Sequence, residues 1–333
     1  MTEEWNERKE KKILRRYRFT LTLRIIRVAF IVLFVYWAYM MVVTISYQQS
    51  TKGEKLAAYS QLVVDWQYPG VSSEFGAFHN VDISPFLTQT TSISLYRKIG
   101  KDQKDVGHFN VKKPLFRNVT YVNYEFYQKS DKPEFNFWLP IHPETGKQLE
   151  ANEHSGVWET LEKIHEGTVA DLAFSTKKYM SQEELFLLLD DYDVDVVWMP
   201  VYMGELDIFS EGWWGSENSI SVYPWGLTNG RDFDSDYQNR SKMYPSKENI
   251  EAIERLMIDN MKRLYNDDPK LTEAIFRTRH FQERIEYLEQ NGFKVYGAVV
   301  TGPTKELLRL QELEEIQGVQ LGEISFWNWE ENK

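Results

Sequence analysis

The sequence predicts an α+β protein with one N-terminal transmembrane helix, a β-rich membrane-proximal region and a C-terminal layer of two β-α-β units, arranged as in ferredoxin-like folds. Three observations predict this class: an uncharged stretch at residues 28–45, alternating polar and apolar residues within 71–150, and a strand–helix–strand pattern that occurs twice after residue 167. The expected parts are a basic cytoplasmic tail (1–24), the transmembrane helix (25–47), the membrane-proximal region (48–155) and a C-terminal α+β domain (156–333).

The uncharged stretch is just long enough to cross a bilayer, at about 1.5 Å of rise per residue against a hydrocarbon core of roughly 30 Å. A cleaved signal peptide has a shorter apolar core that ends at small residues in an A-x-A-like site. Residues 43–47 contain no such site, so we expect a retained, single-pass anchor in the cell membrane. Tyr36 and Trp37 are candidate contacts to a partner helix or a second copy, with plain exposure to lipid as the alternative. The positive-inside rule predicts a cytoplasmic N-terminus and an extracytoplasmic remainder, because nine basic residues precede the stretch: Arg8, Lys9, Lys11, Lys12, Arg15, Arg16, Arg18, Arg24 and Arg27.

Charge is divided sharply between the two sides of the anchor. The first 27 residues carry nine basic and four acidic side chains, whereas the chain from Ser46 onward carries 30 basic and 46 acidic ones. Such an acidic outer part is expected to be repelled by nucleic acid and by anionic lipid, while the basic tail holds the inner leaflet. The chain has no cysteine, which excludes a disulfide framework and thiolate chemistry.

The membrane-proximal region reads as one helix followed by strands. Residues 50–66 are amphipathic and predict a helix, which Pro69 and Gly70 end. Alternation over residues 92–96 and 119–127 predicts strands.

The C-terminal domain shows a weak internal duplication of a strand, a helix and a strand. Ser181 and Glu184 form a capping box at the first helix, and Pro303 fits the first turn of the second. The first unit covers 168–174, 181–189 and 194–202, and the second covers 294–301, 303–313 and 318–326.

A long loop over residues 207–243 and two helices are expected between the two units. The helices run from Pro245 or Ser246 to about Tyr265, and from residues 268–269 to residues 291–292. The loop is rich in aromatic residues, whose alternative roles are packing onto the domain, a partner interface and stacking on a glycan. These candidates include Trp213, Trp214, Trp225 and Phe233.

No catalytic or cofactor signature is present, so we expect a non-enzymatic protein without cofactor or metal. The histidines show no metal-ligand spacing. Asp232, Asp234 and Asp236 alternate, but they lack the glycine and the closing glutamate of an EF-hand, so a weak cation site is the lesser alternative to solvated acids.

The segment from Thr301 to Lys305 lies where a strand turns into a helix. Thr304 and Lys305 are candidates for holding an anion at the helix start, although a plain helix cap, with Thr304 satisfying orphan amides, is favoured. Other residues are expected to shape the backbone or to seal the second unit. These are Gly297, Gly302 and Pro303 for the backbone, and Trp327 and Trp329 for the seal.

Several segments resemble a known family. They are GFKVYGAVVTGPTKE at 292–306, followed by Val319, Gly322, Glu323 and the ending at 327–329, with weaker likeness at 11–16, 167–170 and 192–194. This pattern is similar to that of the sigma-factor regulators, single-pass membrane anti-sigma factors of Gram-positive, Bacillus-type bacteria. The resemblance implies a transmembrane regulator that restrains an extracytoplasmic-function sigma factor in response to envelope stress.

Two functional hypotheses follow. In the first, the chain regulates a sigma factor either directly or as the outer subunit of a pair with a small membrane partner, since about 24 residues precede the span and are expected to be too few to wrap a sigma factor alone. In the second, the chain is an envelope binding or assembly module that uses its aromatic loop. An anchored hydrolase would need an acid–base cluster that the sequence does not show.

Overall fold

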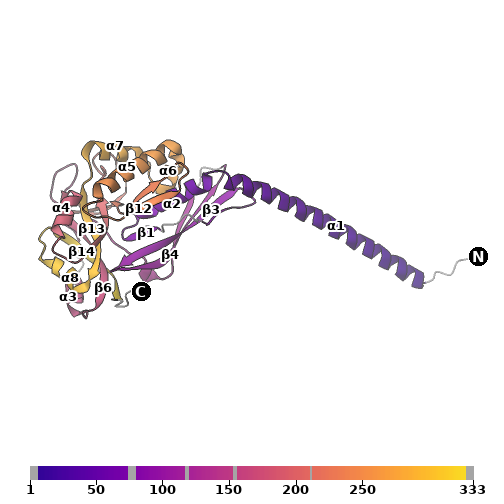
Figure 1. Cartoon of the computed structure of the whole chain (residues 1–333), viewed down its shortest axis with the longest axis horizontal. Coiled ribbons are helices and arrows are strands. Elements are labelled where there is room, and N and C mark those ends of the chain that lie inside the picture. Colours follow the sequence, from indigo (N-terminus) through magenta and orange to yellow (C-terminus); the bar gives the residue numbers. More distant parts are fainter. Residues whose placement is uncertain (1–6, 74–79, 117–119, 153–155, 211, 328–333) are drawn as a thin grey trace, which may run out of the picture. The chain divides into compact units, whose positions relative to one another are not determined.

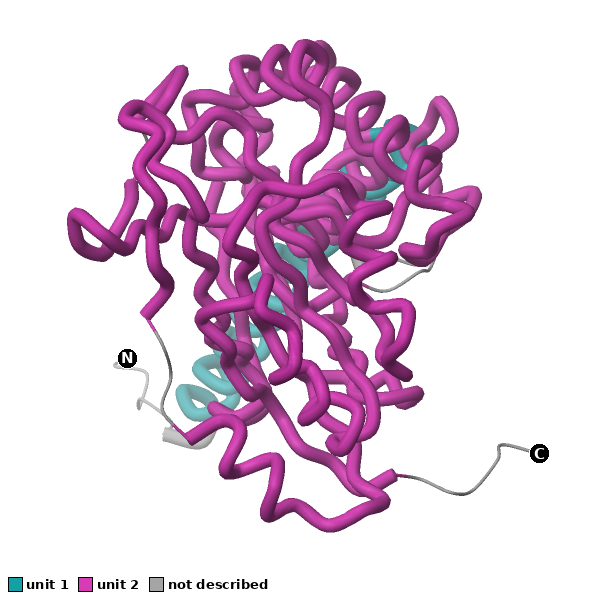
Figure 2. Tube along the Cα trace, turned by 90° about the vertical axis from the view of Figure 1, so that its left-hand side faces the viewer, with its two compact units in different colours: residues 1–51 teal, residues 52–333 magenta. Residues whose placement is uncertain are grey.

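The computed structural model describes residues 7–73, 80–116, 120–152, 156–210 and 212–327. The chain divides into two compact units, Met1–Thr51 and Lys52–Lys333 (Figure 2).

The first unit is one long helix, α1 (Glu7–Gln48). It contains an 18-residue window of mean hydropathy 2.4, and by length and composition it is able to cross a membrane. The predicted span is thus part of a longer helix that also includes most of the basic segment. Tyr36 and Trp37 are both exposed on it.

The region expected to be membrane-proximal is β-rich, as predicted. It forms an antiparallel sheet in the order β1 (Val71–Ser73), β3 (Thr88–Ile99), β4 (Asp102–Pro114), β5 (Tyr121–Phe126), with β2 (Asn80–Ile83) also paired to β3. Strands β3 and β4 form the longest hairpin, which Figure 1 shows in purple and magenta. The short 3-10 helix η1 (Lys129–Asp131) follows β5.

Helix α2 (Lys52–Gln67) lies where a helix is predicted, but it is buried on nearly all sides rather than amphipathic. It packs against β1 and β3 of the first sheet and also against β10 and α6 of the C-terminal part. A helix enclosed in this way has no solvent-facing stripe, which explains the run of apolar residues from Leu62 to Val64.

A second sheet forms the C-terminal part, in the order β10 (Trp225–Leu227), β7 (Asp195–Val201), β13 (Val295–Pro303), β6 (Thr168–Met180), β14 (Ile316–Phe326). All of its neighbouring strands are antiparallel. Helix α4 (Gln182–Leu188) starts at the predicted capping box, with Ser181 and Glu184 each bonded to the other's backbone. In Figure 1, α3 (Val157–Lys163), α4 and α8 (Thr304–Arg309) lie on the left of the body. The 3-10 helix η2 (Leu310–Glu312) follows α8 in the chain.

Residues 207–243 are not a long loop, so that expectation is wrong. They form β8 (Trp213–Ser216), β9 (Ser219–Val222), β10, β11 (Gly230–Phe233) and β12 (Asn239–Met243). Strands β8 and β9 form one short hairpin, and β11 and β12 form another. Strand β10 extends the second sheet. Strands of three to five residues carry too little alternation to be separated from loop residues in a sequence.

The following helices are α5 (Ile250–Asp267), α6 (Pro269–Phe276) and α7 (Phe281–Asn291). Asp268 caps α6 by accepting a hydrogen bond from Leu271 N, but the single helix predicted up to residue 291 is wrong. Arg277 adopts the left-handed conformation at φ 52° and ends α6, so that α7 starts as a separate helix. In Figure 1 these three helices lie along the top of the body.

One continuous core of buried side chains runs from α2 through both sheets to α5, α6 and α7. Residues on either side of position 155 contribute to it, including Leu62, Phe109, Phe174 and Phe276. The expected division into a region at 48–155 and a domain at 156–333 stays a prediction.

Candidate functional site

The segment that carries the family resemblance forms the central strand β13 and the turn into α8. At Gly297 an added Cβ would lie 2.3 Å from the carbonyl oxygen of Phe174, and at Gly302 it would lie 2.6 Å from that of Asp193. Any side chain at either position would therefore collide with backbone. These glycines allow β13 to lie close to its neighbours.

The turn after β13 differs from the expected cap. Pro303 is the last residue of the strand and precedes the helix instead of lying in its first turn, and no side chain caps α8. The hydroxyl of Thr304 is buried and bonds the hydroxyl of Thr168 at 2.8 Å, so its expected role as a cap is wrong. Lys305 Nζ donates to Glu162 O at 3.2 Å, which directs the lysine towards α3 and away from an anion at the helix start.

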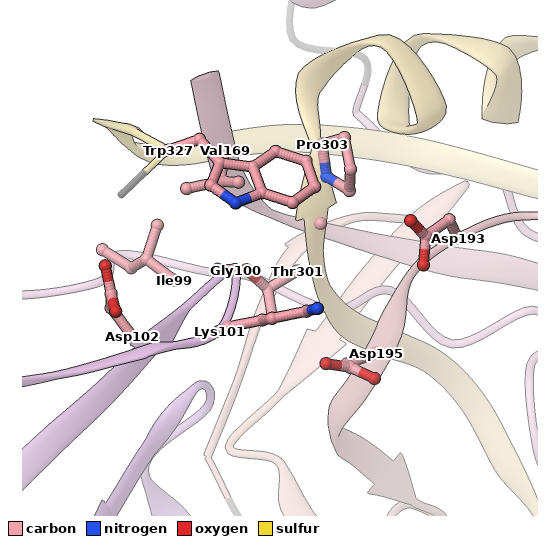
Figure 3. Close-up of a pocket in the computed structure, with 11 residues that line it drawn as sticks. Ile99, Gly100, Lys101, Asp102, Val169, Asp193, Asp195, Thr301, Pro303 and Trp327 are labelled. Atoms are coloured by element: carbon pink, nitrogen blue, oxygen red, sulfur yellow. Dashed lines mark hydrogen bonds between the residues drawn. The ribbon is translucent and has the colours of Figure 1, made fainter. Parts of the chain in front are cut away.

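A small pocket of about 70 Å³ lies where the β3–β4 turn meets the ends of β6, β7 and β13 (Figure 3). The hydroxyl of Thr301 organises this junction, because it accepts a hydrogen bond from Gly100 N at 2.6 Å and donates to Ala170 O at 2.8 Å. Trp327 and Pro303 line one side. The pocket is too small for an organic substrate, so its residues serve the junction; Trp329 lies outside the described residues.

A buried ionic network holds the β3–β4 hairpin against the second sheet. Arg97 on β3 donates two hydrogen bonds to Asp171 on β6, at 2.7 and 2.9 Å. Lys104 on β4 bridges Asp131 and Glu323, each at 2.7 Å. Burial raises the pKa of the Asp171 carboxyl, against the opposing effect of Arg97. The pair of Arg97 and Asp171 thus joins residues far apart in the chain inside a low-dielectric region.

A second buried network fixes α2. Arg231 on β11 contacts Asp65 on α2 at 2.5 Å, with both side chains fully buried, and it also donates to the backbone of Ser73. The indole nitrogen of Trp198 donates to Asp65 O at 3.0 Å. Burial together with the charge of Arg231 lowers the pKa of the nearby Lys242 to about 8. Helix α2 is therefore held by ionic contacts as well as by apolar packing.

A third buried pair joins Arg284 on α7 to Glu205, which follows β7. The guanidinium lies over the rings of Phe209 and Trp225, at 4.7 and 4.9 Å from their centroids. This pair fixes α7 next to the edge strand β10.

The candidate aromatic residues of 207–243 separate into two groups. Trp225 and Phe233 are buried in the core. Trp213 and Trp214 on β8 are 49% and 37% exposed, and Trp214 contacts the exposed ring of Tyr223. A cavity of about 520 Å³ next to this hairpin is lined mainly by aromatic and apolar side chains from α2, β5, β10, α6 and the segments beside them, which include Tyr68, Tyr124, Tyr223, Trp225 and Phe276.

The acidic run at 232–236 begins in β11 and continues into the turn before β12. Asp234 Oδ1 accepts hydrogen bonds from the backbone of Asp236 and Gln238, both at 2.9 Å, and these bonds lower the pKa of Asp234. Within the part of the chain that the structure describes, no group of three or more His, Asp or Glu side chains is arranged to hold a metal ion.

The buried ionic residues Asp65, Arg97, Asp171 and Arg231 were missed by sequence reasoning. One signal for Asp65 was available, because an acidic residue within the apolar run LVVDW indicates a buried partner. The partner itself lies 166 positions away in the chain, and local patterns carry no information about it.

The described molecule thus combines a helix able to cross a membrane with a compact α+β body stabilised by buried ion pairs. Residues 11–104 match the family model described as sigma factor regulator N-terminal, and residues 161–323 match the model described as sigma factor regulator C-terminal. The chain belongs to the sigma-factor regulator family.

A similar curated protein is the probable anti-sigma-M factor YhdL of Bacillus subtilis (strain 168), which is 24% identical over 259 residues. The aligned part covers 72% of this chain and 61% of that protein, so the chain spans less than two thirds of the relative's length. No solved structure matches the chain.

Proposed function

We propose that the chain is a membrane-anchored regulator of an extracytoplasmic-function sigma factor, with α1 crossing the cell membrane and the α+β body outside. The observation that carries this proposal is the N-terminal family match, which runs from residue 11 in the basic part of α1 to residue 104 in β4. One family region therefore includes the candidate span together with the start of the body. The basic residues before residue 28 support a cytoplasmic N-terminus.

Regulation across a membrane requires a free energy of coupling between a site outside and a site inside. Helix α2 is the route that we propose. Three residues separate it from the end of α1, and Asp65 and Trp66 hold its other end inside the core. A change in the packing of the body would reach the membrane helix through this helix.

The body is proposed to act through protein partners and without catalysis. We interpret strands β7, β13, β6 and β14 as a ferredoxin-like layer, because two strand–helix–strand units interleave in an antiparallel sheet, and β10 is then an added edge strand. The proposed partner is a sigma factor, contacted directly or through a small membrane protein, and the acidic body disfavours nucleic acid.

The experiment that tests this function is crosslinking and pull-down of the full-length chain from its native membrane, combined with deletion of the chain. We expect recovery of a sigma factor, alone or with a small membrane protein, and altered transcription of an envelope-stress regulon on deletion. An unchanged transcriptome, with and without stress, would refute the proposal.

A second function, binding of an envelope ligand, is supported by the exposed rings of Trp213 and Trp214 beside the aromatic cavity. Replacing both with alanine should abolish capture of that ligand without unfolding the body. A Phe326→Ala variant is the matched control, because this ring is also exposed. Equal capture by both variants would exclude the hairpin as the binding surface.

A further inference from the structure

One end of the β3–β4 hairpin carries exposed aromatic side chains. Thr88 pairs with Pro114 at this end, so Phe86 and Phe116 lie just beyond the paired residues. Phe86 is 91% exposed and Phe116 is 85% exposed. We call Phe86, Phe116, Tyr121, Lys112 and Lys113 the aromatic tip, since Tyr121 is also exposed and pairs with Lys112 on the neighbouring strand.

The backbone of the aromatic tip is well defined by hydrogen bonds. Leu87 N donates to Ser84 O, and Ser84 N donates to Thr88 O, both at 2.9 Å. Leu115 N donates to Leu87 O at 2.9 Å and so joins the two segments. The rings are therefore presented outward by an ordered turn. Exposed aromatic rings on a fixed scaffold indicate an apolar partner outside the body.

The register of α2 against the first sheet shows which end of the body carries the tip. Val71, opposite Arg97, donates to the carbonyl of Tyr68, whereas Ser73, opposite Leu95, donates to Asp65. Moving back along α2 therefore leads towards the low-numbered end of β3. The start of α2 and the aromatic tip lie at the same end of the body.

The tip reaches at least as far as the start of α2. From Asp65 back to Lys52 the helix spans about 20 Å at 1.5 Å per residue, and from Leu95 back to Thr88 the strand spans about 23 Å at 3.3 Å per residue. Residues 49–51 connect α2 to α1, and a link of this length spans on the order of 10 Å. A bilayer crossed by α1 is therefore within reach of the tip.

The charges of the lysines at the aromatic tip also favour contact between the tip and a membrane surface. Lys112 is exposed and Lys113 is half-buried, and Asp82 is the described acidic residue on the neighbouring strand at this end. The chain after residue 46 is acidic as a whole, so a basic pair beside exposed aromatic rings is a local exception. Aromatic rings together with lysines are typical of the membrane–water interface.

We propose that the aromatic tip inserts into the interface of the bilayer that α1 crosses. Phe86 and Phe116 lie at the boundary of headgroups and acyl chains, and Tyr121, Lys112 and Lys113 lie among the headgroups. This proposal rests on the proposed span α1. It gives the body a second attachment to the membrane, which fixes its orientation above the surface.

The chain contains no cysteine, so single cysteines carry a nitroxide label without background. We would label full-length Phe86→Cys and Phe116→Cys variants, reconstituted in vesicles of phosphatidylcholine and phosphatidylglycerol. Collisions of each label with oxygen and with a water-soluble nickel complex report its depth. Phe326→Cys is the matched control, because Phe326 is 84% exposed and precedes Trp327, which lines the same pocket as the turn at the other end of the hairpin. A label at Val35 in α1 reports whether the helix is inserted.

We expect a high ratio of oxygen to nickel accessibility at positions 86 and 116, a low ratio at position 326 and hydrocarbon depth at position 35. The Lys112→Glu, Lys113→Glu double variant should lower the ratio at position 86. Water-like ratios at 86 and 116 with position 35 at depth would overturn the tip proposal alone, and a water-like position 35 would overturn the anchor as well. Dipolar broadening between identical labels at position 86 would show that a second copy, not lipid, covers the tip.

Discussion

At the scale of single residues, the body depends on charged side chains that lie inside it. Arg97, Arg231 and Arg284 are each fully buried, and each has a carboxylate partner in a distant part of the chain. Removing one member of such a pair leaves the other charge without compensation in a low-dielectric region. These contacts therefore determine which elements remain together more than they add net stability.

Replacing Arg231 with methionine should lower the free energy of unfolding by about 3–5 kcal/mol, because the Asp65 carboxylate then lacks its cation. Urea unfolding of the detergent-solubilised full-length chain, followed by tryptophan fluorescence, measures the change. Lys247→Met is the control, since Lys247 pairs with Asp190 at the exposed surface and should cost less than about 1 kcal/mol. Equal losses of unfolding free energy in the two variants would contradict a stronger effect of the buried Asp65–Arg231 pair.

The carboxyl of Glu254 on α5 makes the stability of the fold depend on pH. Burial, with the charges of Glu183 and Glu251, raises its pKa from 4.5 to about 7. The folded state then holds a proton that the unfolded state releases, so this carboxyl destabilises the fold as the pH rises from 4.5 to 7. We expect Glu254→Gln to equal the wild type in stability at pH 4.5 and to exceed it at pH 8. A constant difference at both pH values would show that this carboxyl does not titrate as described.

At the scale of elements, β13 organises the second sheet. It pairs with β6 on one side and β7 on the other, and its residues from Val295 to Gly302 are buried. A strand buried on both faces reads as a continuous apolar run, which is why the sequence predicts it well. Its glycines are needed where backbone approaches backbone.

Gly297→Ala should destabilise the body by about 1–3 kcal/mol, because the new methyl group overlaps the carbonyl of Phe174 and forces β13 and β6 apart. Thermal unfolding followed by circular dichroism measures the loss. In the control variant Gly212→Ala, the new Cβ meets only the exposed ring of Tyr223, at 3.2 Å, and that ring is able to move. We expect the control to melt close to the wild type, and a similar melting point for Gly297→Ala would argue against close strand packing.

At the scale of the whole molecule, the proposed function depends on the connection between α1 and the body. Only residues 49–51 separate α1 from α2, and α2 is enclosed by the core. A short connection into a rigid element transmits a change of position, whereas a flexible one absorbs it.

Insertion of a short Gly–Ser segment after Ser50 should therefore abolish the response of the envelope-stress regulon to stress, while the amount of folded protein stays unchanged. A transcriptional reporter measures the response, and protease resistance of the body measures folding. The same insertion beside Gly146, where an added Cβ would meet no atom within 4 Å, is the control and should leave the response intact. A normal response with the insertion after Ser50 would exclude α2 as the route.

The sequence by itself determined the features that depend on local composition. The apolar run gave the candidate span, the periodic segments gave the α+β class with β3, β5, β6, β7 and β13, and the box of Ser181 and Glu184 placed the start of α4. The motif at 292–306 led to the family, which the comparisons confirmed. Each of these signals is carried by neighbouring residues, whose geometry is fixed by helix or strand periodicity.

Only the tertiary structure decided the pairing of distant charges, the end of α6 at Arg277, the division of 207–243 into short strands, and the burial of Trp225 beside the exposure of Trp213. Thr304 bonds Thr168 rather than the amides of its own helix. The pairing of β13 with β6 brings the two hydroxyls together. A buried charge or hydroxyl selects its partner by proximity in space, and proximity across more than a hundred residues is set by sheet order and core packing, which no local pattern encodes.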